Sequence, residues 1–279
     1  MLFKASMKTT VFPYQKKSGG VGKSTLFIDI FKFLLVILGL TWLMVHGMET
    51  LGYNWQWYRV PQYLFTFKNG RLQAGLLLDG LMVTLYISGL SLLLAFIFGL
   101  TTALLRFSKS FLGSVLARGY LEIVRNTPLL VQLFFIYFVL GPILGFDRFF
   151  SAVLALSLFE GAYASEIFRA GIVSIPKGQW EAAHSLGLST RSTFSRIILP
   201  QAIRRILPPL TGQAISLIKD SALVSTIAIY DLTMRGQEII ANTYLAFEIW
   251  FTVAAIYLVI TIALSTIVNR MEIHFRMAV

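Results

Sequence analysis

A glycine-rich stretch near the N-terminus contains the residue types of a phosphate-binding loop. It reads KKSGGVGKSTL, from Lys16 to Leu26. In such loops backbone N–H groups cradle the phosphates and a lysine contacts them, in the pattern G-x-x-x-x-G-K-[ST] or the variant K-G-G-x-G-K-[ST]. The first pattern needs glycine where the chain has Lys17, and the variant needs lysine where it has Ser18. A working loop also follows a buried strand and opens a helix beside a water-filled cleft, and the surrounding sequence has room for neither.

The composition of the chain is that of a membrane protein. Of its 279 residues, 56% are hydrophobic and 13% are charged, and the mean hydropathy is +0.73. This is far more apolar than a soluble domain of ordinary make-up. The sequence contains no cysteine, which excludes disulfides and thiolate metal sites. His46, His184 and His274 are too far apart for an i, i+4 pair, so no metal site is predicted.

Six segments are long and apolar enough, or nearly so, to cross a membrane. A spanning helix needs roughly 20 mostly apolar residues. The candidates are residues 27–45, 76–105, 129–144, 151–168, 207–230 and 247–268. The sequence therefore predicts an all-α polytopic membrane protein with about six transmembrane helices.

Lysine and arginine are concentrated in alternate segments between these helices. If the N-terminus is cytoplasmic, 17 of the 24 lysines and arginines fall in cytoplasmic segments and five in outside segments. One inside segment, for example, contains Arg106, Lys109, Arg118 and Arg125. Because such residues favour cytoplasmic loops, both termini are predicted to be cytoplasmic. Five acidic residues balance the outside bases, so the net charge of +11 indicates cytoplasmic anchoring rather than nucleic-acid binding.

The first apolar segment is expected to remain in the protein as an anchor. It is too long for the apolar region of a signal peptide and lacks a small-x-small exit site. The sequence METLGYNWQWYRVPQYLF follows at residues 48–65, and its tyrosines and tryptophans are typical of the membrane interface on the outer side. On the inner side, Lys16, Lys17 and Lys23 precede the segment, and lysines near anionic lipid contribute about 1 kcal/mol each. The glycine-rich stretch is therefore interpreted as a lipid anchor.

The longest cytoplasmic segment between the later helices is residues 175–209, IPKGQWEAAHSLGLSTRSTFSRIILPQAIRRILPP. Pro176 suits a helix start and Gly187 suits a left-handed helix end, which together predict a helix of about ten residues. Ser189 or Thr190 can cap a second helix through Ile198. Three prolines are expected to break the chain before it re-enters the bilayer: Pro200, Pro208 and Pro209.

The first of these short helices is predicted to dock another protein. Glu181 lies in its first turns, where the helix dipole favours an acidic residue. Ala182 and Ala183 are expected to leave a low-relief face that another backbone can approach. Trp180 is expected to be a large apolar anchor on that face.

The residues of this segment resemble a known family, the permease subunits of ABC importers. The family's loop E-A-A-x3-G-x9-I-x-L-P is matched at every defined position, by Glu181, Ala182, Ala183, Gly187, Ile197, Leu199 and Pro200. Three further stretches are similar to the branch that takes up polar amino acids: VRNTPLLVQLFFIYF (124–138), GAYASEIFRAGI (161–172) and SLIKDSALVSTIA (216–228). The resemblance covers about residues 80–270.

This resemblance implies an importer transmembrane domain at residues 80–270, with a five-helix core and a coupling loop at 175–209. Residues 27–79 then form an added transmembrane helix and its outer loop, and residues 1–26 and 271–279 form cytoplasmic tails. It also implies a bacterial inner-membrane subunit that binds no cofactor and has no ATPase site. Its partners would be two ATPase subunits that use ATP, a second permease of the same or a homologous kind, and an extracytoplasmic solute-binding protein. Loose likeness favours glutamate, glutamine or aspartate as the substrate.

Charged residues within the apolar segments could line a translocation path. Each costs on the order of 2.5 to 3.5 kcal/mol at a helix centre. Glu160 is predicted at mid-helix, as are Lys219 and Asp220. Glu160 and Lys219 would either meet the ammonium and carboxylate groups of the substrate or form a structural ion pair with each other. Glu166 and Arg169, nearer the cytoplasmic end, are expected to make structural contacts.

Other functional classes fit the sequence less well. A membrane-tethered ATPase would need a soluble domain of about 150 residues, whereas the longest cytoplasmic segment has about 40. A membrane enzyme would need convergent catalytic groups at one depth, and the three histidines are scattered. A channel or ion-coupled transporter not driven by ATP remains an alternative, which dependence of uptake on ATP and a binding protein would exclude.

Replacing Lys23 by alanine tests the interpretation of the glycine-rich stretch. Uptake driven by ATP should survive Lys23→Ala, because the phosphate-loop pattern is incomplete and the lysine serves as one of several lipid contacts. Micromolar nucleotide binding by the isolated subunit, abolished by this substitution, would contradict the interpretation.

Overall fold

The structure, a computed structural model, describes residues 23–50, 52–68, 70–108 and 110–276. The glycine-rich stretch before Lys23 lies outside these residues. The chain divides into two compact units, Met1–Trp55 and Gln56–Val279, and each is described by itself.

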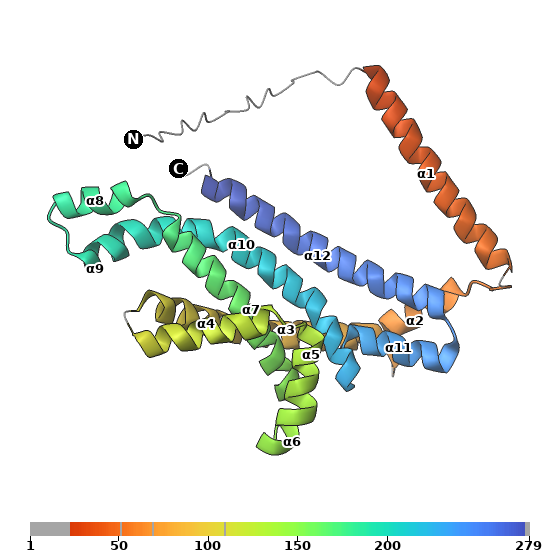
Figure 1. Ribbon diagram of the computed structural model, residues 1–279. Helices are drawn as coiled ribbons and strands as arrows, with labels where there is room; N and C mark the ends of the chain where they lie inside the picture. Colours follow the sequence, from red (N-terminus) through yellow and green to blue (C-terminus); the bar gives the residue numbers. More distant parts are fainter. Residues whose placement is uncertain (1–22, 51, 69, 109, 277–279) are drawn as a thin grey trace, which may run out of the picture. The chain divides into compact units, whose positions relative to one another are not determined.

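The first unit contains one long helix, α1 (Lys23–Thr50; red in Figure 1). Its side chains from Phe27 to Val45 are exposed. The segment Phe27–Gly47 is long and apolar enough to cross a membrane. A helix with such a surface has no broad polar face to turn to water, so lipid suits it.

The second unit begins with a small hairpin, which the all-α prediction did not include. A 3₁₀ turn and a short helix lead into two antiparallel strands: η1 (Trp57–Arg59), α2 (Pro61–Leu64), β1 (Phe65–Lys68) and β2 (Arg71–Ala74). Gly70 has a φ of +71° at the turn. Glycine adopts this conformation without steric cost, and the dipeptide Asn-Gly at 69–70 is a hairpin signal in the sequence.

Two long parallel helices form the centre of this unit, α3 (Leu76–Phe107) and α7 (Arg148–Val173). The Ser91 hydroxyl donates to the Val153 carbonyl at 3.5 Å, and Arg106 pairs with Glu166 at 2.6 Å. The residue numbers of the partners differ by 62 in the first contact and by 60 in the second, so the two helices run in the same direction. Their close approach depends on small side chains, as described for Gly99 below.

A bent helical segment connects the two. It comprises α4 (Phe111–Arg125), α5 (Leu129–Phe134), the π-helical η2 (Phe135–Leu140) and α6 (Gly141–Leu144). The bend between α4 and the helices after it is 108°. The Tyr120 hydroxyl on α4 donates to the Leu158 carbonyl on α7. The sequence analysis placed Arg106 to Arg125 in a segment between two spans and did not predict this helix, which packs on α7.

The C-terminal part of the unit returns along the two central helices. Its elements are α8 (Lys177–Ser185), α9 (Thr190–Thr193), the π-helical η3 (Phe194–Ile198), α10 (Leu199–Asp220), the 3₁₀ helix η4 (Ser221–Ile227), α11 (Leu232–Thr243) and α12 (Ala246–Arg276). Gln213 bonds to Glu160, and Gly171 lies against Ile206. Residue numbers rise on α10 as they fall on α7, so these helices are antiparallel.

The all-α polytopic fold is confirmed, with a different set of spans. Among the described residues, four helical segments are long and apolar enough to cross a membrane: Phe27–Gly47, Leu76–Phe107, Arg148–Val173 and Ala246–Val268. Phe111–Arg125 and Leu129–Leu144 make a fifth if the bent pair is one span. The predicted span 207–230 is wrong in its bounds, because α10 begins at Leu199 and ends at Asp220. Lys219 and Asp220 consequently lie at the end of a helix rather than in its middle.

The three prolines expected to break the chain do not break it. Ser189 caps the second short helix as predicted, accepting from the Ser192 N–H at 3.3 Å. The helix then continues through η3 into α10, with Pro200 in its first turn and Pro208 and Pro209 inside it. Pro200 lies where no amide hydrogen bond within the helix is required, whereas Pro208 and Pro209 each remove one without ending the helix.

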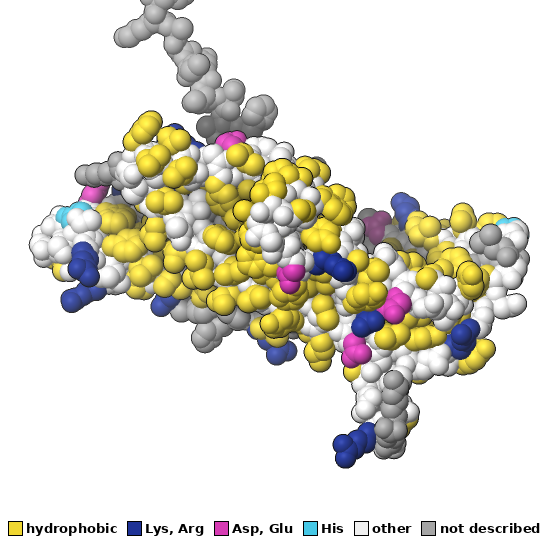
Figure 2. Space-filling model, turned by 90° about the horizontal axis from the view of Figure 1, so that it is seen from below, with side chains coloured by type: hydrophobic (Ala, Val, Ile, Leu, Met, Phe, Trp, Pro, Cys, Tyr) yellow, Lys and Arg dark blue, Asp and Glu magenta, His cyan; other side chains and the backbone are white. Residues whose placement is uncertain are grey.

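The two ends of the second unit carry different structures. Because α3 and α7 are parallel, the hairpin before α3 and the short helix α8 after α7 lie at opposite ends (Figure 1). Hydrophobic side chains cover much of the middle of the face drawn in Figure 2, with charged side chains in small groups. Lipid is the solvent that such a surface requires.

The contact between α3 and α7 gives a testable prediction. A Cβ atom at Gly99 would lie 2.8 Å from the Ala164 Cβ and 3.0 Å from the Gly161 carbonyl oxygen, whereas a Cβ at Gly89 on the same helix meets nothing within 4 Å. Gly99→Ala should therefore lower the thermal stability of the detergent-extracted protein, by about 1–3 kcal/mol of overpacking. Gly89→Ala is the matched control and should be neutral. Equal melting temperatures for both variants would contradict this packing.

Candidate functional site

The predicted docking helix is α8, and its ends are fixed by local backbone chemistry. Pro176 precedes its first residue. At its other end the Gly187 N–H donates to the His184 carbonyl at 2.9 Å and the Leu188 N–H donates to the Ala183 carbonyl at 3.1 Å. Gly187 has a φ of +77°. This is a Schellman stop, which needs a left-handed residue after the helix, and the sequence predicted both the helix and its glycine end.

The orientation of α8 corrects the prediction for its surface. Ala183 is buried, and Trp180 packs on an apolar cluster that includes Phe168 and Ile198. Trp180 and Ala183 are three residues apart and therefore share the face that α8 turns to its own chain. Glu181 and Ala182 are exposed as expected. The exposed apolar residue is Leu186, with 80% of its surface accessible, which sequence reasoning missed.

The base of α8 is tied to α10. Arg205 on α10 donates to the Ser174 carbonyl at 2.6 Å and to its hydroxyl at 3.1 Å. Ser174 caps the C-terminus of α7, where the helix dipole favours a cation. The rings of Trp180 and Phe194 are 6.4 Å apart. The remaining motif residues, Ile197, Leu199 and Pro200, lie along η3 and the start of α10.

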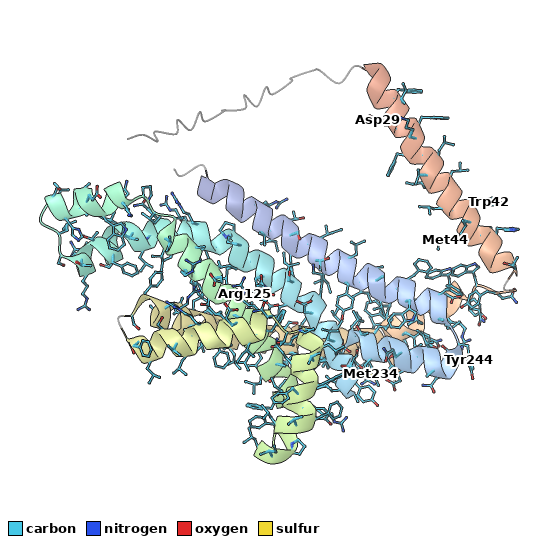
Figure 3. All side chains as sticks on the ribbon, viewed as in Figure 1. Asp29, Trp42, Met44, Arg125, Met234 and Tyr244 are labelled. Atoms are coloured by element: carbon cyan, nitrogen blue, oxygen red, sulfur yellow. The ribbon has the colours of Figure 1, made fainter. Side chains whose placement is uncertain are left out.

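An ion-pair network lies at the same end of α7. Glu166 pairs with Arg106 at 2.6 Å, Arg169 at 3.0 Å and Arg125 at 3.3 Å. Arg125 also lies over the Tyr163 ring, between α4 and α7 (Figure 3). One carboxylate thus joins α3, α4 and α7, which is the structural role expected for Glu166 and Arg169.

A buried carboxylate lies nearer the middle of α7. Glu160 is 1% exposed, and its Oε2 accepts from the Gln213 side-chain amide of α10. Its Oε1 is buried and has no hydrogen-bond partner among the described residues. Glu160 borders a cavity of about 170 Å³ between α3, α7 and α10, whose other lining residues are Leu92, Ala95, Phe96, Ala164, Leu210, Thr211, Gln213 and Ala214.

The structure brings two of the three predicted path residues together. The Asp220 carboxyl is close enough to interact with that of Glu160. Gln213 and Asp220 are seven residues apart and so share one face of α10. Lys219 is exposed, and no ion pair joins it to Glu160 in the described part of the chain. The alternative of a structural Glu160–Lys219 pair therefore lacks the contact it requires. Gln213 is a path candidate that sequence reasoning missed.

The chemistry of this cavity suits a positively charged group. Glu160 is the one charged residue among the described residues that line it, and its unpaired buried oxygen can accept a hydrogen bond from a cation. A second, wholly apolar cavity of about 460 Å³ shares Phe96 and Leu210 with the first and extends towards α8, to Phe194 and Leu199. Among the described residues, no cluster of three or more metal-ligating side chains occurs.

The sequence of the chain is similar to those of known transport proteins. Residues 92–276 match the family described as "Binding-protein-dependent transport system inner membrane component". The glutamine transport system permease protein GlnP of Escherichia coli (strain K12) is 43% identical over 200 residues, which are 71% of this chain and 91% of that protein. The L-cystine transport system permease protein TcyB of Bacillus subtilis (strain 168) is 40% identical over 225 residues, 80% of this chain and 92% of that protein.

Solved structures show the same relationship. A crystal structure of an amino acid ABC transporter with histidines has a TM-score of 0.68 and 38% identity, and the similarity covers 71% of this chain and 94% of that chain. The MetNI methionine ABC transporter in an inward-facing conformation has a TM-score of 0.60 at 18% identity, covering 72% and 96% of the two chains. The second likeness concerns the fold alone.

Substitution of Glu160 tests the cavity. Glu160→Gln keeps the size of the side chain and a hydrogen bond to Gln213 but removes the charge. Solute uptake should fall about tenfold or more, as expected for the loss of a charge-assisted hydrogen bond, while the monodisperse yield stays normal. Lys219→Met, which alters an exposed residue, should also leave the yield normal. A low yield for either single variant, rescued in the double variant, would instead establish a structural pair; unchanged uptake in Glu160→Gln would contradict the path.

Proposed function

The chain belongs to the binding-protein-dependent transport system inner membrane component family, and on that premise we propose that it is the permease subunit of an ATP-driven importer of polar amino acids. In this role it forms the translocation path and passes on the movement of separate ATPase subunits. The observation that carries the proposal is α8, a short helix with a fixed stop that stands at one end of the membrane unit. Glu181, Ala182, Ala183 and Gly187 on or beside it satisfy the coupling-loop pattern.

The exposed face of α8 is suited to dock into an ATPase subunit. Leu186 provides an exposed apolar contact and Glu181 an exposed charge, and interfaces combine such anchors with a polar rim. Because Trp180 and Arg205 hold α8 to the chain, a push on this face moves α7 and α10 with it. The chain itself performs no ATP hydrolysis in this proposal, and ATP is used by the partner subunits.

The cavity at Glu160 is proposed as part of the substrate path. Every amino acid carries an α-ammonium group, which Glu160 and Asp220 can meet, and the Gln213 amide can bond to a polar side chain. Glutamine suits this site better than glutamate or aspartate, because a second negative charge would be repelled by the two carboxyl groups. The apolar cavity beyond it leads towards α8.

The proposed assembly has two permease subunits, two ATPase subunits and an extracytoplasmic binding protein. The docking face of α8 lies in the cytoplasm, as do both termini, and the hairpin end lies outside. This orientation follows the excess of lysine and arginine in the segments assigned to the inside.

The stop of α8 at Gly187 gives a matched test of the proposal. Neither Gly187 nor Gly178 would place a Cβ within 4 Å of another atom, but only Gly187 has a positive φ. Gly187→Val should therefore strain the loop by about 1–2 kcal/mol or more, since a β-branched residue is disfavoured there. Co-purification with the ATPase subunits or ATP-dependent uptake should fail in this variant. Gly178→Val should retain both.

Reconstituted vesicles provide the measurement. Uptake is followed with and without ATP and with and without the binding protein, beside the recovery of ATPase subunits on the tagged permease. Wild-type recovery and uptake in Gly187→Val would contradict the coupling role of α8. Uptake by the wild-type protein in the absence of ATP and binding protein would favour a channel or an ion-coupled transporter.

A further inference from the structure

The hairpin at residues 65–74 has an apolar face turned away from its own chain. The register places Phe65 opposite Ala74 and Phe67 opposite Leu72, so these four residues share one face. Phe67 is 80% exposed, Leu72 58% and Phe65 52%. On the polar face Thr66 is less exposed, whereas Arg71 and Gln73 are exposed. A hairpin surrounded by water would bury its apolar face on the core.

The base of the hairpin is fixed to the end of a membrane span. The Gly75 N–H donates to the Leu64 carbonyl at 2.8 Å. A Cβ at Gly75 would lie 2.5 Å from the Tyr63 carbonyl group, so the two backbones are in direct contact. β2 ends at Ala74 and the span Leu76–Phe107 begins two residues later. The hairpin therefore cannot leave the membrane boundary by more than the length of its own strands, about 13 Å.

The length of α3 places this boundary near the lipid headgroups. Its 32 residues extend about 48 Å. The hydrocarbon core is about 30 Å thick, and the bilayer with its headgroups about 40–45 Å. A helix of this length that spans the core carries its first turn into the headgroup region, and the hairpin begins there.

The residues around the hairpin suit lipid rather than a protein partner. Trp57 and Tyr58 in the preceding turn are exposed, and such rings favour the membrane interface. The turn, short helix and hairpin at residues 57–74 contain three basic residues, Arg59, Lys68 and Arg71, and no acidic residue, and Asp79 lies in the first turn of α3. Basic residues next to an apolar face are attracted by phosphate headgroups.

We propose that the hairpin is an interfacial anchor, which inserts the face of Phe65, Phe67 and Leu72 into the phospholipid surface where α3 begins. This surface belongs to the leaflet at the end opposite α8. The hairpin lies before the part of the chain that matches the family model, residues 92–276. By holding the first turn of α3 at the lipid surface, it fixes the depth of the helix on which α7 packs.

Single cysteines test the proposal directly, because the natural chain has none. Phe67→Cys and Leu72→Cys place a nitroxide label on the apolar face, and Gln73→Cys places one on the polar face of the same strands. The labelled permease, assembled with its ATPase subunits, is reconstituted in vesicles of phosphatidylethanolamine and phosphatidylglycerol. Collision with oxygen, which concentrates in lipid, is compared with collision with a water-soluble nickel chelate. Retained uptake identifies the variants that fold, and Leu72→Cys serves if Phe67→Cys does not.

The expected result is a severalfold higher ratio of oxygen to nickel accessibility at positions 67 and 72 than at position 73. Equal ratios at the three positions would overturn the proposal, because the apolar face would then lie in water. Labels at 67 and 72 that neither reagent reaches would also overturn it, since a protein surface would cover the face. A loss of accessibility only after addition of the substrate-loaded binding protein would assign the face to that partner instead.

Discussion

The close contact between α3 and α7 is the constraint on which the rest of the second unit depends. Lipid gives packed apolar helices little advantage over separated ones, so association depends on close approach of backbones across small residues. Gly99, Gly161 and Ala164 provide that approach. Once the two helices are parallel and in register, the arginines of α3 and α4 can reach Glu166, and Glu160 is enclosed beside α3. The hairpin and α8 are then separated by the full length of the pair.

The long helical stretch that follows α8 provides a route by which movement can cross the membrane. The helical stretch from Thr190 to Asp220 is continuous through a π-helical turn and three prolines. It contacts the base of α8 through Arg205 at one end and reaches Glu160 through Gln213 farther along. A continuous helix can transmit displacement along its length. Pro208 and Pro209 remove hydrogen bonds inside α10 and so fix the place at which it can bend.

The sequence predicted the long apolar helices well, because their periodicity and length are strong local signals. It also predicted the Gly187 stop and the Ser189 cap, which depend on neighbours in the chain. It failed where tertiary contacts decide. Proline rules alone could not show that α10 continues through Pro208 and Pro209, and loop charge could not show that α4 packs on the core. The inward direction of Trp180 follows from a neighbouring apolar cluster that is distant in sequence. Gln213 was missed because one amide in an apolar segment carries no signal without its partner.

Two glutamates on α7 illustrate why charge within a membrane segment does not by itself indicate function. Glu166 is surrounded by three guanidinium groups from three elements, so its charge is more than balanced by the protein. Glu160, six residues earlier, has one amide partner, an unsatisfied buried oxygen, a nearby carboxyl group and a cavity beside it. A buried carboxylate without a countercharge is costly unless a cation or a proton joins it. The difference in partners, rather than the residue type or depth, therefore separates the glutamate that joins three helices from the one that we propose to meet the solute.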